Sequence, residues 1–445
     1  MDAHLWRLTV PMLLGMASMM IASMIDTIYV GRLGTGELAA LSFSFPVVMV
    51  MVSISMGVGM GATSIIARSM GSGDRMRVRR LATHALLLVL LISSACAALG
   101  VYYTEAIFSA LGARGELLEL VVRYMHIWFM ALPVFALPMV ATSIMRAVGS
   151  ARAPGVIMTS ASVIQVVAAP PLMFGIPGLF DGLGFEGSPI AFLVSRALTF
   201  LLCIYLIGPR MKLLTRDGLR LPVVLGSWRE VMRIGVPSSL SQLIAPVSMA
   251  IVIRMLSDHG PAVVAAMGVA SRIESLATMV LMSLSGSLSP FIGQNFGARQ
   301  DERIRESIRL CNRFSLYYAI AAAIVLGIAG DYLVALINDD PGVVEATHLY
   351  LLLVPFSYGL LGVGMCAGST FMSLGRPMPT LVMSIARMFV LYVPVAWLGN
   401  HFFGYAGVFA ATAFANCAMG VIAWAWSRRT LAQEIRTRDA TAGAH

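Results

Sequence analysis

Charged side chains are scarce in this sequence. Only 12% of its 445 residues are Asp, Glu, Lys or Arg, and 58% are hydrophobic, whereas about a quarter of the residues in a typical soluble domain are charged. The mean hydropathy is +0.84. This composition excludes an ordinary soluble protein and predicts a membrane protein. A strict alternation of apolar and polar residues is also missing, which argues against a membrane β-barrel.

Signatures of catalysis and of nucleotide hydrolysis are missing too. No HExxH or GxSxG motif is present, and the five cysteines have no CxxC spacing, so we interpret the cysteines as apolar packing residues. Gly57, Gly59 and Gly61 lack the lysine of a P-loop and are expected to allow close helix packing. We therefore expect no enzyme activity, no ATP-driven pump, no metal site and no cofactor.

Twelve apolar runs are present instead, each long enough to cross a hydrocarbon layer of about 30 Å, which needs about 20 helical residues. The first six lie near residues 9–30, 38–67, 81–103, 118–146, 154–175 and 187–208. The second six lie near 230–256, 261–294, 308–329, 345–372, 378–399 and 405–427. The predicted fold class is an all-α polytopic membrane protein with twelve transmembrane helices.

The second half of the chain repeats the first. Pro11 returns as Pro237 and Gly71 returns as Gly297, in both cases 226 residues later. Such repeats are common in transporters built from two related helix bundles. The expected parts are an amino-terminal lobe at 1–208, a cytoplasmic linker at 209–229 that tethers the lobes, a carboxyl-terminal lobe at 230–428, and a polar tail with a frayed helix end at 429–445.

Basic and acidic residues occupy different loops. Basic residues such as Arg75 and Arg299 follow the even-numbered runs, whereas acidic residues such as Glu105 and Asp331 stand in the other loops. Because Lys and Arg in short loops stay on the cytoplasmic side, we expect both termini in the cytoplasm. This asymmetry explains the net charge of +9. The basic loops are expected to lie against anionic lipid head groups. No nucleic-acid partner is therefore expected.

Asp26 interrupts the first apolar run. A charge near the bilayer centre costs roughly 2.5–3.5 kcal/mol and is usually functional. Desolvation favours the neutral form of a buried acid, so we expect Asp26 to take up and release a proton. The alternative is an interface position with hydrogen bonds to Thr27, Tyr29 or a loop amide.

Further charges interrupt later runs. Arg196 lies in the sixth, Arg272 and Glu274 lie in the eighth, and Arg387 lies in the eleventh. Residues two apart do not share a helix face, so Arg272 and Glu274 are expected to pair with other helices. A contact between Glu274 and Arg387 is inferred only from the opposite charges of their side chains. We favour a static ion pair over a second coupling site, and both interpretations stay open.

Five segments in order along the chain resemble the bacterial multidrug and toxic compound extrusion (MATE) transporters. They are Leu8-Thr-Val-Pro11, Asp26-Thr-Ile-Tyr-Val-Gly31, Met145-Arg-Ala-Val-Gly149, Gly293-Gln-Asn-Phe-Gly297 and Phe371-Met-Ser-Leu-Gly-Arg-Pro377. The resemblance covers essentially the whole chain. It implies two six-helix lobes around a V-shaped cavity in a bacterial inner membrane. It also implies export of organic cations or amphipathic compounds, driven by protons or sodium, by rocking of the lobes.

The resemblance also suggests which ion is coupled. In sodium-binding relatives an Asn-x-x-x-Asp pair on the fifth helix and a Thr on the sixth join the first-helix aspartate. The matching positions here are Gln165, Ala169 and Phe192, and a hard cation requires several oxygen ligands. We therefore predict proton coupling through Asp26, with Gln165 as the candidate hydrogen-bond partner. Sodium coupling is the alternative.

Pro11 matches the family's first-helix proline, where a missing backbone hydrogen bond allows a bend when Asp26 is protonated. Methionines recur every four residues along the first helix and can adapt to differently shaped ligands, although helix packing or lipid contact also explains them. The residues expected to line a substrate cavity are Met20, Met24, Tyr29, Tyr124 and Gln242.

The expected partners are small organic cations or amphipathic drugs and membrane lipids, and the protein is expected to be a monomer. A lipid-linked oligosaccharide flippase of the same superfamily is the alternative transporter. Such flippases usually have additional helices and a basic cavity for phosphate, so the twelve apolar runs and the acid of the first run argue against it.

Overall fold

Long α-helices dominate the computed structural model of this chain, which describes residues 2–150, 152–176, 180–335 and 340–442. Within these residues, twelve helical segments are long and apolar enough to cross a membrane, as the sequence predicts. The chain divides into two compact units. We call Trp6–Ser239 the N-terminal unit, and Leu240–His445 with Met1–Leu5 the C-terminal unit.

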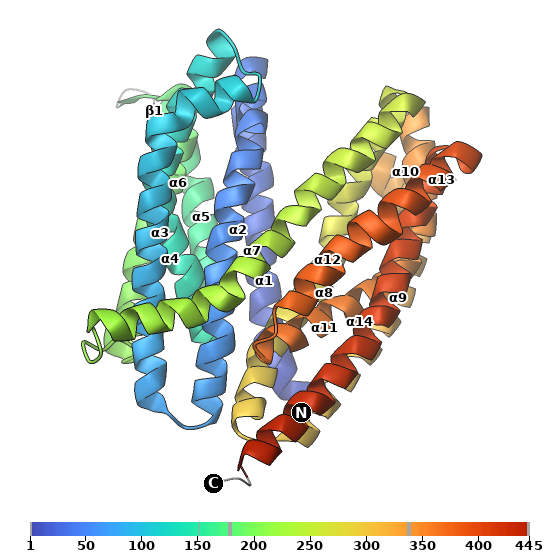
Figure 1. Cartoon of the computed structure of the whole chain (residues 1–445). Coiled ribbons are helices and arrows are strands. Elements are labelled where there is room, and N and C mark those ends of the chain that lie inside the picture. The colour runs from blue at the N-terminus through green and yellow to red at the C-terminus, as the bar shows by residue number, and fades with distance from the viewer. Residues whose placement is uncertain (1, 151, 177–179, 336–339, 443–445) are drawn as a thin grey trace. The chain divides into compact units, whose positions relative to one another are not determined.

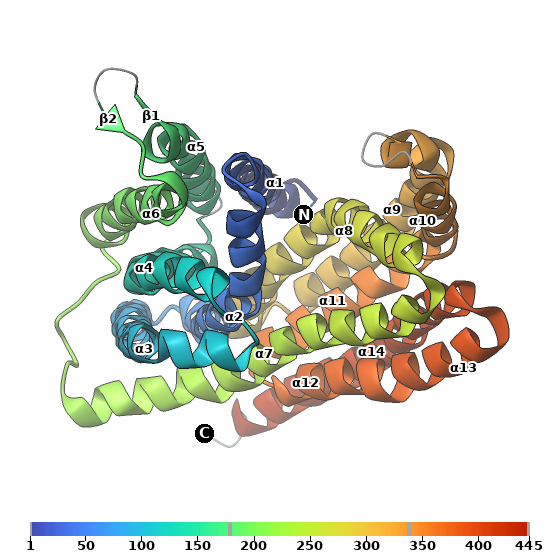
Figure 2. The same ribbon diagram turned by 90° about the horizontal axis from the view of Figure 1, so that it is seen from above.

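The N-terminal unit contains six spans and the first part of α7 (Figure 1). Its helices are α1 (Asp2–Gly31), α2 (Thr35–Gly71), α3 (Arg75–Ala110), α4 (Glu116–Ala147), α5 (Arg152–Phe174), α6 (Gly187–Tyr205), the π-helical turn η2 (Leu206–Arg210) and the start of α7 (Leu221–Leu256). An antiparallel hairpin of β1 (Gly175–Ile176) and β2 (Phe180–Asp181), followed by the 3-10 turn η1 (Gly184–Glu186), connects α5 to α6 (Figure 2). The spans are helical because a bilayer leaves no water to satisfy the backbone.

The C-terminal unit has two spans that are interrupted. Its elements after α7 are η3 (Ser257–His259), α8 (Pro261–Gly297), α9 (Asp301–Ala335), α10 (Pro341–Leu353), η4 (Pro355–Ser357), α11 (Tyr358–Ser373), α12 (Met378–Ile385), η5 (Ala386–Tyr392), α13 (Val393–Phe403) and α14 (Tyr405–Ala442). Pro355 and Pro394 stand at the breaks. A proline has no N–H for the α-helical ladder, so the backbone changes to a 3-10 turn at η4 and to a π-helical turn at η5.

The segment expected to be a tether is docked on α3. Nη2 of Arg79 donates to the carbonyl oxygen of Leu214 at 3.0 Å, and the indole of Trp228 donates to that of His84 at 2.9 Å. The linker has no apolar core of its own, but the polar end of α3 supplies it with hydrogen bonds. The segment predicted as a linker at 209–229 is thus hydrogen-bonded to α3, and its second part, from Leu221, belongs to α7.

A close contact between α2 and α7 holds the first part of α7 in the N-terminal unit. A Cβ atom added to Gly61 would lie 2.3 Å from the carbonyl oxygen of Val231, and one added to Gly57 would lie 2.5 Å from that of Gly235. Only glycine allows two helix backbones to approach this closely. The division between the units consequently falls inside α7, after Ser239.

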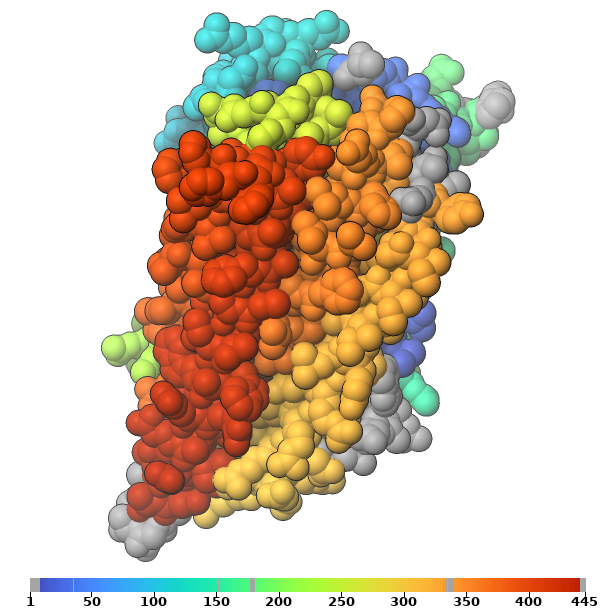
Figure 3. All heavy atoms as spheres, turned by 90° about the vertical axis from the view of Figure 1, so that its right-hand side faces the viewer, coloured from blue at the N-terminus to red at the C-terminus, as the bar shows by residue number. Residues whose placement is uncertain are grey.

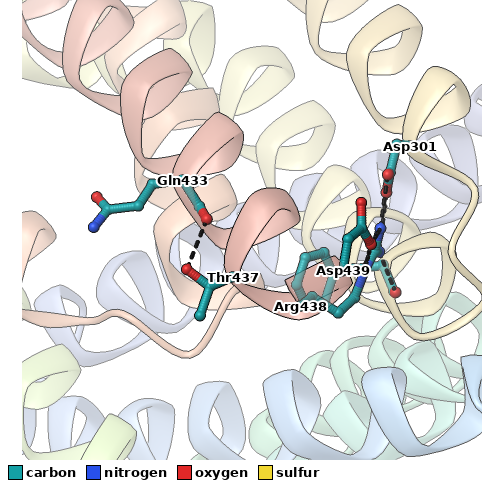
Figure 4. A network of polar contacts seen from close by, with 6 residues as sticks. Asp301, Gln433, Thr437, Arg438 and Asp439 are labelled. Atoms are coloured by element: carbon teal, nitrogen blue, oxygen red, sulfur yellow. Dashed lines mark hydrogen bonds and ion pairs between the residues drawn. The ribbon is translucent and has the colours of Figure 1, made fainter. Parts of the chain in front are cut away.

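The predicted frayed tail is a packed continuation of α14. Leu431 and Ile435 are buried in an apolar cluster with residues of α8 and α9. Arg438 donates to both carboxylate oxygens of Asp301, at 3.0 and 2.7 Å (Figure 4). The guanidinium of Arg438 also covers the ring of Phe296. Figure 3 shows the last turns of α14 (red) beside the start of α9 (yellow). As far as Ala442, the expectation of fraying is therefore wrong.

Candidate functional site

Asp26 of α1 and Ser188 of α6 are joined by a hydrogen bond. The Ser188 hydroxyl lies 3.0 and 3.2 Å from the two carboxylate oxygens of Asp26. Ser188 is buried and Asp26 is half-buried. A serine hydroxyl can donate to a carboxylate and can accept from a carboxylic acid. Ser188 can therefore serve both protonation states of Asp26.

The first turn of α6 holds Ser188 in this position. A Cβ atom added to Gly187 would lie 2.6 Å from the carbonyl oxygen of Leu172, so the start of α6 packs directly on the end of α5. Pro189 follows in the first turn of α6, where a helix needs no N–H from that residue. Gly187 and Pro189 thus fix the backbone on either side of the serine.

Tyr124 of α4 lies beside this pair. Its buried ring stacks on Phe185 with centroids 5.0 Å apart, and its hydroxyl is close enough to Asp26 to interact electrostatically. Tyr29, three residues after Asp26, instead makes an edge contact with Phe174 at 6.2 Å. The two tyrosines expected to line a substrate cavity therefore have different surroundings.

The other cavity candidates lie on α1 and α7. Met20 is half-buried, Met24 is 48% exposed, and Gln242 is half-buried in the C-terminal unit. Pro11 lies inside α1, where its carbonyl oxygen would be 2.6 Å from a Cβ atom added to Gly155 of α5. The close contact with α5 thus occurs at the predicted bending point, and the bend itself stays a prediction.

The predicted hydrogen bond between Gln165 and Asp26 is wrong. In the described part of the chain the Gln165 side chain accepts from Nη2 of Arg196, at 3.5 Å, and not from Asp26. Both side chains are 9% exposed. A buried guanidinium requires an acceptor, and the amide oxygen of Gln165 is the one that α5 offers to it. Asp26 is satisfied instead by Ser188.

The sixth helix supplies Asp26 with a hydroxyl from a position that sequence matching did not point to. Phe192 was matched to the threonine position, but its ring lies under Arg196, 4.8 Å from the guanidinium carbon to the ring centroid. The hydroxyl on Asp26 comes from Ser188, one helical turn earlier. The signal that could have identified it is the Gly-Ser-Pro sequence that opens α6. Ala169 is buried in the apolar core.

Glu274 and Arg387 of the C-terminal unit are each hydrogen-bonded to a neutral neighbour. The Tyr350 hydroxyl donates to Oε2 of Glu274 at 2.6 Å, and Nη1 of Arg387 donates to Oδ1 of Asn416 at 2.9 Å. Glu274 and Arg387 interact electrostatically, but within the described residues they form no direct ion pair. The direct contact between Glu274 and Arg387 that was inferred from their opposite charges is therefore not found.

Arg272 and Glu274 have different environments, as their spacing predicts. Glu274 contacts α10 through Tyr350, as expected of a partner on another helix, whereas Arg272 is exposed on α8, and no pairing with another helix is seen for it within the described residues. Arg387 lies in the π-helical turn η5. Such turns are frequent at functional sites. Within the searched residues, no group of three His, Cys, Asp or Glu side chains could hold a metal ion.

The sequence profile of the MatE family matches residues 11–170 and 237–398. The two matches begin at Pro11 and Pro237, which are the prolines of the internal repeat. The chain is 34% identical over 425 residues to the FAD transporter of Shewanella oneidensis, covering 96% of this chain and 94% of that protein. It is 25% identical over 397 residues to the probable multidrug resistance protein YoeA of Bacillus subtilis, covering 88% and 86%.

Solved structures of the same kind resemble the chain over nearly its whole length. The crystal structure of the Vibrio cholerae MATE transporter VcmN in the bent form superimposes with a TM-score of 0.91 at 28% identity, covering 97% of each chain. The fold predicted from the twelve apolar runs is therefore confirmed by structures as well as by sequence.

Proposed function

Since this chain belongs to the MATE family of secondary transporters, we propose that it exports amphipathic compounds across a bacterial inner membrane in exchange for protons. The protein is a multi-pass membrane transporter and not an enzyme. In this proposal both termini are cytoplasmic, and the N-terminal and C-terminal units move to give alternating access. Asp26 is the group that binds the coupled proton.

The hydrogen bond between Ser188 and Asp26 carries this proposal. When Asp26 is charged, Ser188 donates to it; when Asp26 is protonated, its O–H can donate to Ser188 Oγ in turn. One hydroxyl thus accommodates both states without a second charged group. An unpaired buried polar atom would cost about 1–3 kcal/mol. Because Ser188 pairs with either form of Asp26, a proton can be exchanged there without this cost.

Sodium coupling has less support from the same geometry. A hard cation requires several oxygen ligands. Among the described residues, Ser188 is the only side chain hydrogen-bonded to the Asp26 carboxylate across helices, and the Gln165 amide oxygen is bound to Arg196. One carboxylate and one hydroxyl form a poor cation cage.

Organic cations and other amphipathic drugs are the first candidate substrates, because relatives such as YoeA carry multidrug names. A second candidate is a flavin dinucleotide. It is favoured by the name of the FAD transporter, which is 34% identical to this chain, and by the intramembrane arginine Arg196, which no carboxylate pairs with in the described residues. The two classes differ in charge, so one assay can separate them.

The test is efflux from lipid vesicles that contain the purified protein. A pH gradient or a sodium gradient is imposed, and the movement of ethidium and of FAD is followed by fluorescence. We expect transport with the pH gradient, none with sodium alone, and loss of transport in Asp26→Asn. Glu105→Gln is the matched control, because Glu105 is an exposed acid of α3 in the same unit. Transport that depends on sodium at constant pH would contradict the proposal.

A further inference from the structure

Arg196 lies at the middle of a membrane span. It is the tenth of the 19 residues of α6, so each end of the helix is about 13 Å away along the axis. An arginine side chain cannot cover this distance to reach the lipid heads. A charged residue at such a depth costs roughly 2.5–3.5 kcal/mol unless something compensates it.

No carboxylate compensates Arg196 in the described residues. The one hydrogen bond it makes to a described residue is that to Gln165, which is long at 3.5 Å, and its Nε atom is buried without a hydrogen-bond partner among those residues. Asp26, an acid inside a span of the same unit, is bonded to Ser188 instead. The guanidinium therefore has unused donors and an unbalanced charge.

Aromatic rings form one wall beside this guanidinium. Its carbon lies 4.8 Å from the ring centroid of Phe192 and 5.6 Å from that of Phe135. Trp128 stacks on Phe192, with centroids 6.3 Å apart and an angle of 19° between the planes. Phe135 and Phe192 are half-buried rather than enclosed. Cation–π contact stabilises an arginine partly, by about 0.5–2 kcal/mol, but it satisfies none of its donors.

We propose that Arg196 and Gln165 bind the phosphate or carboxylate of an anionic substrate, and that its planar ring packs against the edges of Phe192 and Phe135. An arginine fork matches the oxygens of phosphate and carboxylate, and aromatic rings make favourable edge-to-face as well as offset-stacked contacts. The inference rests on the second candidate of the proposed function, a flavin nucleotide. Lipid phosphate is a poor alternative because Arg196 lies too deep in the span for a lipid head.

Flavins provide a direct test, because riboflavin, FMN and FAD share one ring and differ in phosphate. Their binding to the purified full-length protein is measured by quenching of flavin fluorescence, without any gradient. We expect FMN and FAD to bind at least about ten-fold more tightly than riboflavin, since hydrogen bonds to a charged group contribute about 1.5–3 kcal/mol. Arg196→Gln should remove this preference and leave riboflavin binding within about two-fold of the wild type. Arg123→Gln is the control, because the Arg123 side chain is 57% exposed.

Gln165→Glu tests the site without removing the buried charge. The new carboxylate should pair with Arg196 and compete with phosphate, so FMN and FAD binding should fall about ten-fold while riboflavin binding is unchanged. Phe192→Leu should instead weaken all three flavins alike, by roughly three- to ten-fold, because the ring is common to them.

Three outcomes overturn the inference. They are equal binding of riboflavin and FMN by the wild type, an equal loss for all three flavins in Arg196→Gln, and unchanged FMN binding in Gln165→Glu. These results are independent of proton coupling. A protein that keeps the phosphate preference but shows no pH-driven efflux would disprove the proposed function alone.

Discussion

The Ser188 hydroxyl lies 3.0 and 3.2 Å from the two carboxylate oxygens of Asp26 and joins α6 to α1. This one contact distinguishes the arrangement found here from the one expected from sequence matching, in which Gln165 partners the acid. The polar residues that we discuss in the N-terminal unit therefore form two separate groups. One consists of Asp26, Ser188 and Tyr124, and the other consists of Gln165 and Arg196.

Ser188→Ala should lower proton-driven efflux by about ten-fold, because the loss of a hydrogen bond to a charged group costs about 1.5–3 kcal/mol. Ser188→Thr keeps the hydroxyl and should retain most of the activity. The initial rate of ethidium efflux under a fixed pH gradient measures the effect. Equal rates in Ser188→Ala and the wild type would show that the contact has no part in coupling.

Gln165→Ala should leave the pH dependence of efflux unchanged, because its amide oxygen contacts Arg196 and not Asp26. Asp26→Asn should abolish that dependence. Efflux measured between pH 6 and pH 8 in both variants decides the matter. If Gln165→Ala shifts the pH profile as strongly as a change at Asp26, the two polar groups are coupled and our separation of them is incorrect.

Gly61→Ala should destabilise the protein by about 1–3 kcal/mol, the usual cost of overpacking. The added methyl group would lie 2.3 Å from the carbonyl oxygen of Val231, so α2 and α7 would have to separate. Thermal unfolding in detergent measures the change. Gly226→Ala on α7 is the control, because nothing lies within 4 Å of the added atom, and it should be neutral or slightly stabilising.

Arg438→Ala should destabilise the C-terminal unit by roughly 1–2 kcal/mol, because it removes the two hydrogen bonds to Asp301 and the contact with Phe296. A double-mutant cycle with Asp301→Ala isolates the pair. Arg436→Ala, at an exposed position of the same helix, should have little effect. A coupling energy near zero would mean that the pair of Arg438 and Asp301 does not stabilise the end of α14.

Tyr350→Phe should destabilise the C-terminal unit by about 1–3 kcal/mol, because the half-buried Glu274 loses the donor that lies 2.6 Å from it. Its efflux should keep the proton dependence of the wild type if Glu274 is structural, as we expect. The measurements are thermal unfolding and pH-driven efflux in the same preparation. A stable Glu274→Gln variant with no efflux would instead support a second coupling site.

The twelve spans follow from the sequence because length and hydropathy are local properties. Each apolar run is near the length that a bilayer requires, and the repeat of Pro11 as Pro237 is visible without any contact. The family motifs identify the class of protein in the same way. The linker and the tail could not be interpreted locally, because Trp228 and Arg438 find their partners on helices far away in sequence.

The sequence by itself determined the membrane class, the two repeated halves, the family and the unusual intramembrane charges, since each of these is written in composition or spacing. Only the tertiary structure decided which charge meets which partner. Helix rotation and the closeness of α5, α6 and α1 set those distances, and a shift of one turn exchanges Phe192 for Ser188. Asp26 was thus identifiable from the sequence, but Ser188 as its partner and the uncompensated Arg196 depend on the packing of helices against one another.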